Sequence, residues 1–303
     1  MSIGNFDGVH LGHQQLLRQA TLRAKELGVA AVAVTFWPHP EKVLRPASEL
    51  MLVTTREQKV QLLKRCGLDA LVELSFTKEF ASTSAAEFAR QFLAGRLAPR
   101  EVHLGKNFKF GKGREGDVAF LRTLGPELGF EVKGMDPIQD EKGPISSTRL
   151  RQVLSSGQVE EAQRLLGRYY FMDGRIAVGQ RMGRCLGFPT LNLQPENELL
   201  LARGVYLTAT FIPSFARCFP GVTNVGVRPT LYENHRLMVE THLLNFTGDV
   251  YREEVRLFFL RRLRDELRFP GVMELAAQVR GDVEAARQFF TSFRCDEEAL
   301  VLP

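Results

Sequence analysis

Residues 3–13 read IGNFDGVHLGH and set the architecture of the first half of the chain. A predicted strand ends at Ile3, and a glycine-containing turn follows it. His10 and His13 come next, at the start of a helical pattern. Residues three apart share one helix face, and a helix N-terminus offers free N–H groups and a positive dipole to an anion. Two imidazoles there can hydrogen-bond a phosphate, and Gly12 leaves the backbone open to it. We interpret the stretch as a phosphate site; the alternative is a pair of surface histidines near a helix start.

Short β-branched runs alternate with helical patterns through the first half of the chain. We expect strands at residues 29–36, 70–76 and 101–104, and helices at residues 14–27, 56–66 and 85–94. Such alternation is typical of βαβ units around a parallel sheet. Thr55 with Gln58, and Ser84 with Glu87, have the spacing of capping boxes at two helix starts. Gly95 stands where the third of these helices is expected to end.

The second half has strand patterns without helices between them, separated by Gly, Pro and Asn turns. The expected strands cover residues 174–178, 204–212, 222–227, 237–246 and 253–263. This pattern favours an antiparallel barrel or sandwich. A helix at residues 272–290 closes the chain, and residues 147–166 are helical apart from a break at 155–157. We therefore expect two domains, residues 1–166 and residues 167–303.

Composition narrows the class of protein. The 303 residues are 44% hydrophobic and 25% charged, which is typical of a folded globular chain. The net charge of +5 is spread along the sequence, so it indicates phosphorylated small molecules rather than a nucleic acid. The four cysteines form no C-x-x-C pair, so neither a zinc site nor a disulfide framework is expected. With neither a long apolar run nor a signal-peptide pattern, we expect no membrane association and a cytoplasmic location.

A second group of candidate residues begins the second half, where residues 183–193 read GRCLGFPTLNL. Thr190 and Asn192 lie on one side of an extended segment and can supply oxygen ligands to Mg²⁺ and phosphates. A strand-end cap is the alternative for this pair. On an expected strand, Glu240 shares a face with Met238, His242 and Leu244, so this acid lies among apolar neighbours and can act as a general base. The alternative there is an outward carboxylate paired with an arginine.

Taken together, these motifs resemble those of the prokaryotic bifunctional riboflavin kinase and FMN adenylyltransferase family. In the first half, the resemblance rests on FDGVHLGH and on TFWPHP at 35–40, GKNFKFGKGREGD at 105–117 and ISSTRLR at 145–151. In the second half, it rests on GRCLGFPTLNL, TNVGVRPT at 223–230 and VETH at 239–242. The resemblance implies a Rossmann-like α/β nucleotidyltransferase domain followed by a six-stranded antiparallel Greek-key barrel with a C-terminal helix.

The resemblance also implies the chemistry. ATP would phosphorylate riboflavin to FMN, and a second ATP would adenylylate FMN to FAD with release of pyrophosphate, both with Mg²⁺. The partners would be the small molecules riboflavin, FMN, FAD and ATP. The implied catalytic residues are His10, His13 and Glu240, and the implied Mg²⁺ ligands are Thr190 and Asn192. The implied nucleotide and phosphate contacts are Asn5, Phe6, Asp7, Gly12, Asn107, Ser146, Ser147, Thr148, Arg149, Arg151 and Arg184.

Three other interpretations stay open at this point. Family members normally carry a strand and a dozen or more residues before the G-N-F-D turn, and here three residues precede Gly4, so the transferase half could be impaired and the kinase alone active. A flavin- or nucleotide-binding regulator would bind without turnover. A dehydrogenase could use Gly111, Gly113 and Gly116, spaced as G-x-G-x-x-G, although the preceding KNFKF is too polar for the buried strand that this fingerprint requires.

Overall fold

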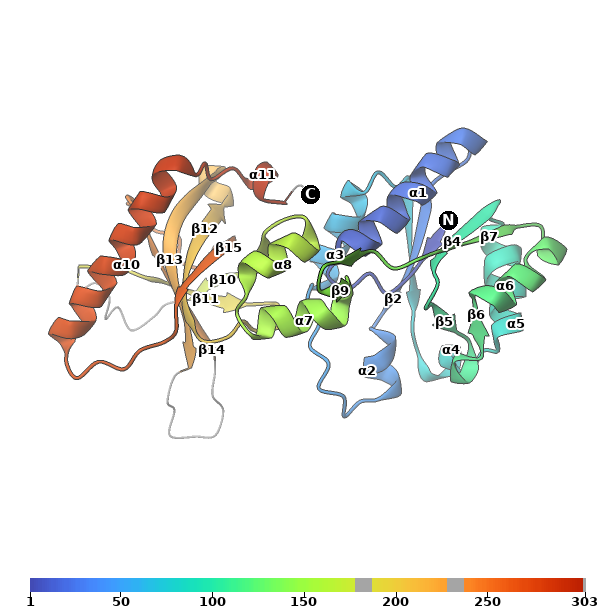
Figure 1. Cartoon of the computed structure of the whole chain (residues 1–303), viewed down its shortest axis with the longest axis horizontal. Coiled ribbons are helices and arrows are strands. Elements are labelled where there is room, and N and C mark those ends of the chain that lie inside the picture. The colour runs from blue at the N-terminus through green and yellow to red at the C-terminus, as the bar shows by residue number, and fades with distance from the viewer. Residues whose placement is uncertain (178–186, 228–236, 302–303) are drawn as a thin grey trace. The chain divides into compact units, whose positions relative to one another are not determined.

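The computed structural model describes residues 1–177, 187–227 and 237–301 (Figure 1). The chain divides into two units, Met1–Ser147 and Thr148–Pro303. The first contains a parallel sheet with helices and the second a closed antiparallel barrel, which confirms the predicted fold class. Among the described residues, no helix has the length and apolar character needed to cross a bilayer.

Five parallel strands form the sheet of the first unit, in the order β3-β2-β1-β4-β7. Their bounds are Ser2–Ile3 (β1), Val32–Trp37 (β2), Ala70–Ser75 (β3), Glu101–Gly105 (β4) and Glu131–Met135 (β7). β1 lies at the centre, where Ile3 pairs with Val34 of β2 and Ser2 with His103 of β4. The strand order reverses between β1 and β4, and ligands of open α/β sheets bind beside the carboxyl ends of the strands at such a switch point.

Helices and two small hairpins surround this sheet. The helices are Leu11–Leu27 (α1), Pro40–Leu44 (α2), Arg56–Arg65 (α3), Lys78–Ala81 (α4), Ala85–Glu87 (α5) and Val118–Leu124 (α6), with 3₁₀ turns at Lys112–Arg114 (η2) and Pro126–Leu128 (η3). The hairpins pair Lys109–Phe110 (β5) with Gly116–Asp117 (β6), and Gln139–Asp140 (β8) with Gly143–Pro144 (β9). Both predicted capping boxes are confirmed, at the starts of α3 and α5.

The expected end of the helix at Gly95 is wrong. After α5 the chain continues as a π-helix, Phe88–Leu97 (η1), and stops where Ala98 adopts a φ of 41°. Gly95 lies inside this helix, where an added Cβ would come within 3.1 Å of the Arg90 carbonyl oxygen. In this wider turn the glycine therefore permits close backbone packing and does not end the helix.

The glycines at 111, 113 and 116 do not form a dinucleotide site. They lie in the β5–η2–β6 hairpin, whereas the fingerprint needs a strand followed by a helix that begins at the glycines. A Cβ at Gly111 would lie 2.7 Å from the Ala85 backbone nitrogen, and one at Gly116 would lie 2.6 Å from Phe110 Cζ. Gly111 and Gly116 thus allow close packing of the hairpin, and the hairpin context of all three glycines removes the dehydrogenase interpretation.

The second unit begins within the helix Ser147–Ser155 (α7), whose first residue still belongs to the first unit, and continues with Val159–Leu166 (α8). Residues 156–158 separate the two helices, one residue later than the predicted break. The barrel strands are Tyr170–Ala177 (β10), Leu191–Pro195 (β11), Gly204–Ile212 (β12), Arg217–Val227 (β13), Leu237–Leu243 (β14) and Glu254–Arg264 (β15), with a 3₁₀ turn at Pro213–Phe215 (η4). The helices Val272–Ser292 (α10) and Glu297–Val301 (α11) follow.

The six barrel strands close in the order β10-β11-β14-β13-β12-β15. β12, β13 and β14 pair consecutively, and β15 returns to lie beside β12, which is a Greek-key arrangement. Of the barrel and the sandwich that the strand pattern left open, the barrel is therefore confirmed. Inside it, the Thr223 hydroxyl lies 2.7 Å from that of Thr208 and 2.8 Å from that of Thr241, so these buried hydroxyls satisfy one another across three strands.

Candidate active sites

The first candidate site begins where the chain leaves β1. Phe6, Gly8 and Val9 have φ values of 52°, 80° and 40°, so the turn of residues 4–9 is left-handed at three positions. Such angles are costly for residues with a Cβ, and strained backbone of this kind concentrates at functional sites. Phe6 is fully buried, so apolar packing holds the turn in this conformation. The turn ends at His10, the residue that caps α1.

The two histidines lie against each other at the start of α1. Their rings are stacked, with centroids 3.7 Å apart and an interplanar angle of 17°. Nδ1 of His10 accepts a hydrogen bond from the His13 backbone N–H at 3.3 Å, so neutral His10 carries its proton on Nε2 and can donate it. A Cβ at Gly12 would lie 3.1 Å from His10 Cε1, so the glycine makes room for this ring. His10 is buried and His13 half-buried.

Asp7 holds the turn in place. Its carboxylate accepts hydrogen bonds from the backbone N–H groups of Val53 and Thr54 and from the Thr54 hydroxyl, at 3.0–3.2 Å. The Asp7 carbonyl oxygen accepts a further bond from the Ser147 hydroxyl at 2.9 Å. This last bond joins the G-N-F-D turn to the I-S-S-T motif across 140 residues of sequence, so the structure brings these two predicted motifs together.

Asn5 and Asn107 follow neighbouring strands. Asn5 comes after β1, and its carbonyl oxygen accepts a bond from the Thr35 hydroxyl at 3.2 Å. Asn107 comes after β4, and both asparagines are exposed. Because β1 and β4 are adjacent and parallel, their carboxyl ends meet at the same edge of the sheet. Both residues therefore lie at the switch point that the strand order defines.

The predicted arginines of the I-S-S-T motif differ in their surroundings. Ser146 is half-buried and α7 begins at Ser147. Arg149 forms an ion pair at 2.8 Å with Glu161 of α8, whose side chain is 6% exposed and also pairs with Arg164. Thr148, which is exposed, and Arg151, which is half-buried, follow on α7 in the second unit. The Arg149 pair joins α7 to α8, a contact that the motif alone does not reveal.

Sequence reasoning missed Lys59, a buried lysine on α3. Its ammonium donates to the Thr35 hydroxyl at 3.2 Å and to the Phe36 carbonyl oxygen at 3.1 Å, near the carboxyl end of β2. Burial lowers the pKa of Lys59 below its usual value. Helical periodicity could have indicated its burial, because Lys59 is spaced to share the inward face of α3 with Leu62 and Leu63.

The second candidate site is built on strand register. Asn192 of β11 lies opposite Glu240 of β14, and Glu240 lies opposite Asn224 of β13. Val205 of β12 is opposite both Asn224 and Arg264 of β15. Directly opposite residues share a face of a sheet, so these five side chains form one row, which we call the outer row. The sequence predicted two of its members, Asn192 and Glu240, and missed the others.

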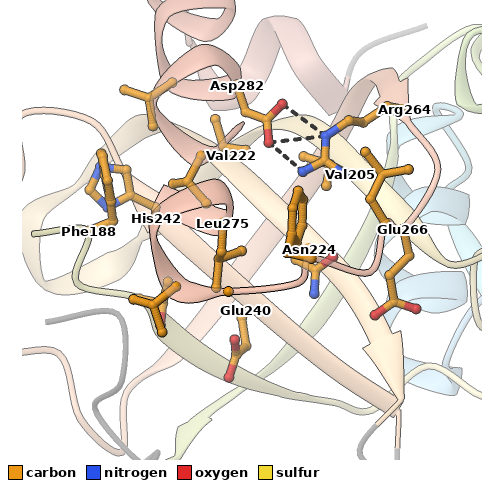
Figure 2. Close-up of a pocket in the computed structure, with 17 residues that line it drawn as sticks. Phe188, Val205, Val222, Asn224, Glu240, His242, Arg264, Glu266, Leu275 and Asp282 are labelled. Atoms are coloured by element: carbon orange, nitrogen blue, oxygen red, sulfur yellow. Dashed lines mark hydrogen bonds and ion pairs between the residues drawn. The ribbon is translucent and has the colours of Figure 1, made fainter. Parts of the chain in front are cut away.

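A cavity of about 600 Å³ lies between the outer row and α10 (Figure 2). Its helix side is apolar, with Leu275, Val279 and Val283. Glu240, which is half-buried, and Asn224 contribute polar groups from the barrel side. The cavity therefore suits a ligand with a large apolar part and a polar part beside Glu240.

Thr190 lines this cavity and also a second one of about 340 Å³. The smaller cavity runs past Asp249 and Tyr251 of the segment after β14. A residue shared by two cavities can contact ligands in both. Thr190 and Asn192 offer hydroxyl and amide oxygens, the hard donors that Mg²⁺ prefers, and Mg²⁺ commonly keeps several waters and substrate phosphates as its other ligands. Arg184, the remaining predicted phosphate contact, lies outside the described residues.

His242 connects these parts of the site. Its Nδ1 lies 2.9 Å from the carbonyl oxygen of Pro189, and because a carbonyl oxygen only accepts, Nδ1 carries the proton. Its ring also packs edge-on against Phe188, with centroids 5.5 Å apart. His242 thus holds the two residues that precede Thr190. Glu240 and His242 are two residues apart on a strand, so the sequence placed both on one face. No sequence pattern indicated the hydrogen bond from His242 to Pro189.

Known protein families match both halves of the chain. A family model described as FAD synthetase matches residues 1–149, and one described as riboflavin kinase matches residues 166–290. The bifunctional riboflavin kinase/FMN adenylyltransferase of Pseudomonas fluorescens is 37% identical over 94% of this chain and 91% of its own length. The protein of the same description from Escherichia coli K12 is 32% identical over 96% of this chain and 92% of its own length.

A solved structure also resembles this chain. It is described as a macrolide-efflux protein from Streptococcus pneumoniae, and it is 31% identical with a TM-score of 0.87. The alignment covers 94% of this chain and 93% of that one. The efflux activity in its description is a statement about that protein, and the similarity extends over the folds of both units.

Proposed function

The chain belongs to the family of bifunctional riboflavin kinases/FMN adenylyltransferases, and we propose that residues 167–303 make FMN while residues 1–166 convert it to FAD. Riboflavin, ATP, FMN and FAD are the substrates and products of these two activities. Both family models match the chain and the relatives carry both activities in their descriptions, which favours the bifunctional enzyme over a kinase alone.

The observation that carries the kinase assignment is the position of Glu240. It stands between Asn192 and Asn224 in the outer row and lines the larger cavity, within reach of a ligand that also meets Thr190. We assign the larger cavity to riboflavin, because its apolar helix side suits the flavin rings. We assign the smaller cavity to ATP, so that the two substrates meet at Thr190.

In the kinase step, the terminal ribityl hydroxyl attacks the γ-phosphorus of ATP. Glu240 takes the hydroxyl proton as the new O–P bond forms, and the bond from the γ-phosphorus to the bridging oxygen breaks to release ADP. Thr190 and Asn192 would hold Mg²⁺, which supplies neutralisation of phosphate charge when bound. His242 fixes the backbone before Thr190, and Arg184 would contact phosphate.

In the adenylyl transfer, a phosphate oxygen of FMN attacks the α-phosphorus of ATP, and the bond to the departing pyrophosphate breaks. His10 and His13 lie at the start of α1 and donate hydrogen bonds to the oxygens on which charge develops. The residues that we propose as further contacts to nucleotide or phosphate are Asn5, Phe6, Gly12, Asn107, Ser146, Thr148, Arg149 and Arg151. Asp7 and Ser147 hold the turn that carries this site.

The central strand of the first unit bears on whether this half is active. Ser2 and Ile3 are both buried and occupy the position between β2 and β4, so the switch point is formed in this chain. We propose that the transferase half is active, and that the enzyme works in the cytoplasm, where ATP is abundant.

Incubating the purified chain with riboflavin, ATP and Mg²⁺, and separating the flavins over time, tests the proposal. We expect FMN first and FAD afterwards. FMN without FAD would leave a kinase alone, and no product would leave a binding protein without turnover. Binding of a macrolide with no flavin product would instead favour the description of the solved structure that this chain resembles.

A further inference from the structure

Glu266 belongs to the larger cavity but has no part in the function derived so far. It lies on the segment between β15 and α10 and lines the cavity together with Asn224 and Glu240. Figure 2 shows the polar ends of these three side chains below the ion pair of Arg264 and Asp282. Glu266 thus stands on the same side of the cavity as the proposed base.

Gly226 of β13 brings Glu266 and Asn224 close together. A Cβ at Gly226 would lie 2.6 Å from Glu266 Oε1 and 3.3 Å from Asn224 Nδ2. The missing side chain therefore leaves the space that the carboxylate occupies beside the amide. Since Asn224 is directly opposite Glu240, the three polar groups follow one another along the cavity wall.

Within the part of the chain that the structure describes, the side chains of Glu266 and Asn224 have no hydrogen-bond or ion-pair partner. Arg264, the one arginine or lysine among the described residues that line the cavity, is paired with Asp282. A carboxylate and an amide without partners at a cavity wall are suited to a ligand that donates hydrogen bonds.

Riboflavin has such donors in one part of the molecule. Its ring system is planar and largely apolar, and its ribityl chain carries a series of hydroxyls that ends in the reacting one. If the terminal hydroxyl is at Glu240, the neighbouring hydroxyls lie along the wall formed by Asn224 and Glu266. The rings then meet the apolar residues of α10, such as Leu275 and Val279.

We propose that Glu266 is a specificity-determining residue of the kinase site, and that its carboxylate accepts hydrogen bonds from the ribityl hydroxyls. This inference rests on the riboflavin kinase activity proposed above. It gives the enzyme a way to select flavins by their side chain, because a flavin without hydroxyls gains nothing from the carboxylate.

The test compares riboflavin with lumiflavin, which has the same rings and a methyl group in place of the ribityl chain. Dissociation constants are measured from flavin fluorescence with ADP and Mg²⁺ present. We expect Glu266→Ala to weaken riboflavin binding about ten-fold, the effect of losing a hydrogen bond to a charged group, and to leave lumiflavin binding unchanged. Glu266→Gln should lie in between, since its amide oxygen still accepts.

Glu274→Ala is the matched control, because Glu274 is an exposed carboxylate on the first turn of α10 that does not line the cavity. It should change neither constant. Equal weakening of both flavins by Glu266→Ala, or of neither, would overturn the inference while FMN formation by the wild type continues. A wild type that forms no FMN would overturn the proposed function itself, and the inference with it.

Discussion

Arg264 and Asp282 join the last barrel strand to the C-terminal helix through a bidentate ion pair at the larger cavity (Figure 2). Arg264 Nη2 lies 2.6 Å from Asp282 Oδ2, and Arg264 Nε lies 3.0 Å from Oδ1. Gln278 donates a further bond to Asp282 at 3.0 Å. The pair fixes the part of α10 whose apolar side chains form one wall of the cavity.

Replacing Asp282 by Ala should therefore loosen this wall and leave a partly buried guanidinium without its partner. We expect a loss of about 3 kcal/mol in unfolding free energy for this unit and a higher KM for riboflavin. Urea unfolding followed by circular dichroism, with flavin kinetics, measures both. The double variant Arg264→Met with Asp282→Leu is the control: it should recover most of the stability. If the double variant is no more stable than Asp282→Ala, the uncompensated charge is not the cause.

His10→Ala should lower FAD formation about 10²-fold or more and spare FMN formation, because it removes a donor to the charge that develops in adenylyl transfer. Adenylylation is measured alone by supplying FMN as the substrate. Phosphorylation is measured by supplying riboflavin and stopping the reaction early, before much FMN has been converted. An equal decrease in both activities would show that His10 supports folding of the chain rather than the transfer.

Glu240→Gln should reduce riboflavin phosphorylation by about 10²- to 10⁴-fold, because the amide cannot take the hydroxyl proton. Adenylylation of added FMN should continue at the wild-type rate, which serves as the internal control for folding. An unchanged rate of FMN formation would exclude Glu240 as the base.

His242→Asn and His242→Leu test the bond to Pro189. The asparagine amide can replace Nδ1 as a donor and the leucine cannot, so we expect His242→Leu to require several-fold more Mg²⁺ for half-maximal kinase activity and His242→Asn to stay near the wild type. The reason is that the bond fixes the backbone before Thr190. A similar Mg²⁺ requirement in both variants would show that this bond does not position the metal site.

Glu101 makes the stability of the first unit depend on pH. Hydrogen bonds from Arg23, and with them a weaker one from His103, lower the pKa of Glu101 from its usual 4.5 to about 2, against the opposing effect of burial. Its contribution is present above pH 4.5 and is lost as the pH falls toward 2. The contribution is at most about 3 kcal/mol, and less because Arg23 is 41% exposed.

Glu101→Gln should accordingly be less stable than the wild type above pH 4.5, and the difference should close toward pH 2. Trp37, the single tryptophan of the chain, belongs to the first unit, so its fluorescence reports the unfolding of this unit. A difference that stays constant across this range would assign the effect to packing rather than to ionisation.

Much of the local structure could be predicted from short-range signals. The capping boxes at Thr55 and Ser84 depend on residues three apart, and β12 begins and ends at the residues expected from its pattern. The roles of Gly95 and Gly111 could not be inferred in this way. Their close neighbours are a carbonyl in a widened helix and the backbone of a different helix, and these contacts cannot be inferred from the position of a glycine in the sequence. Position alone predicted a helix end at Gly95, and for Gly111 only the polar KNFKF stretch argued against a dinucleotide loop.

The parts of the sites that sequence reasoning missed depend on register and tertiary contact. Thr190, Asn192 and Glu240 could be chosen from their motifs, whereas Asn224 and Glu266 joined them only through strand pairing and the path of the chain after β15. Lys59 is buried because its helix packs against the sheet on that side. Lysines are usually exposed, so residue type alone predicted a surface position for it.

The outer row has a consequence for how this enzyme tolerates change. Asn192 and Glu240 sit on adjacent, directly paired strands, so their separation follows from the backbone spacing of about 4.8 Å between strands. Substitutions inside the barrel that weaken packing should thus reduce stability long before they alter this distance. A single-residue insertion in β14 before Glu240 should instead abolish the site and cost less stability. It would turn the carboxylate toward the threonines of the interior, while most of the barrel's hydrogen bonds could re-form.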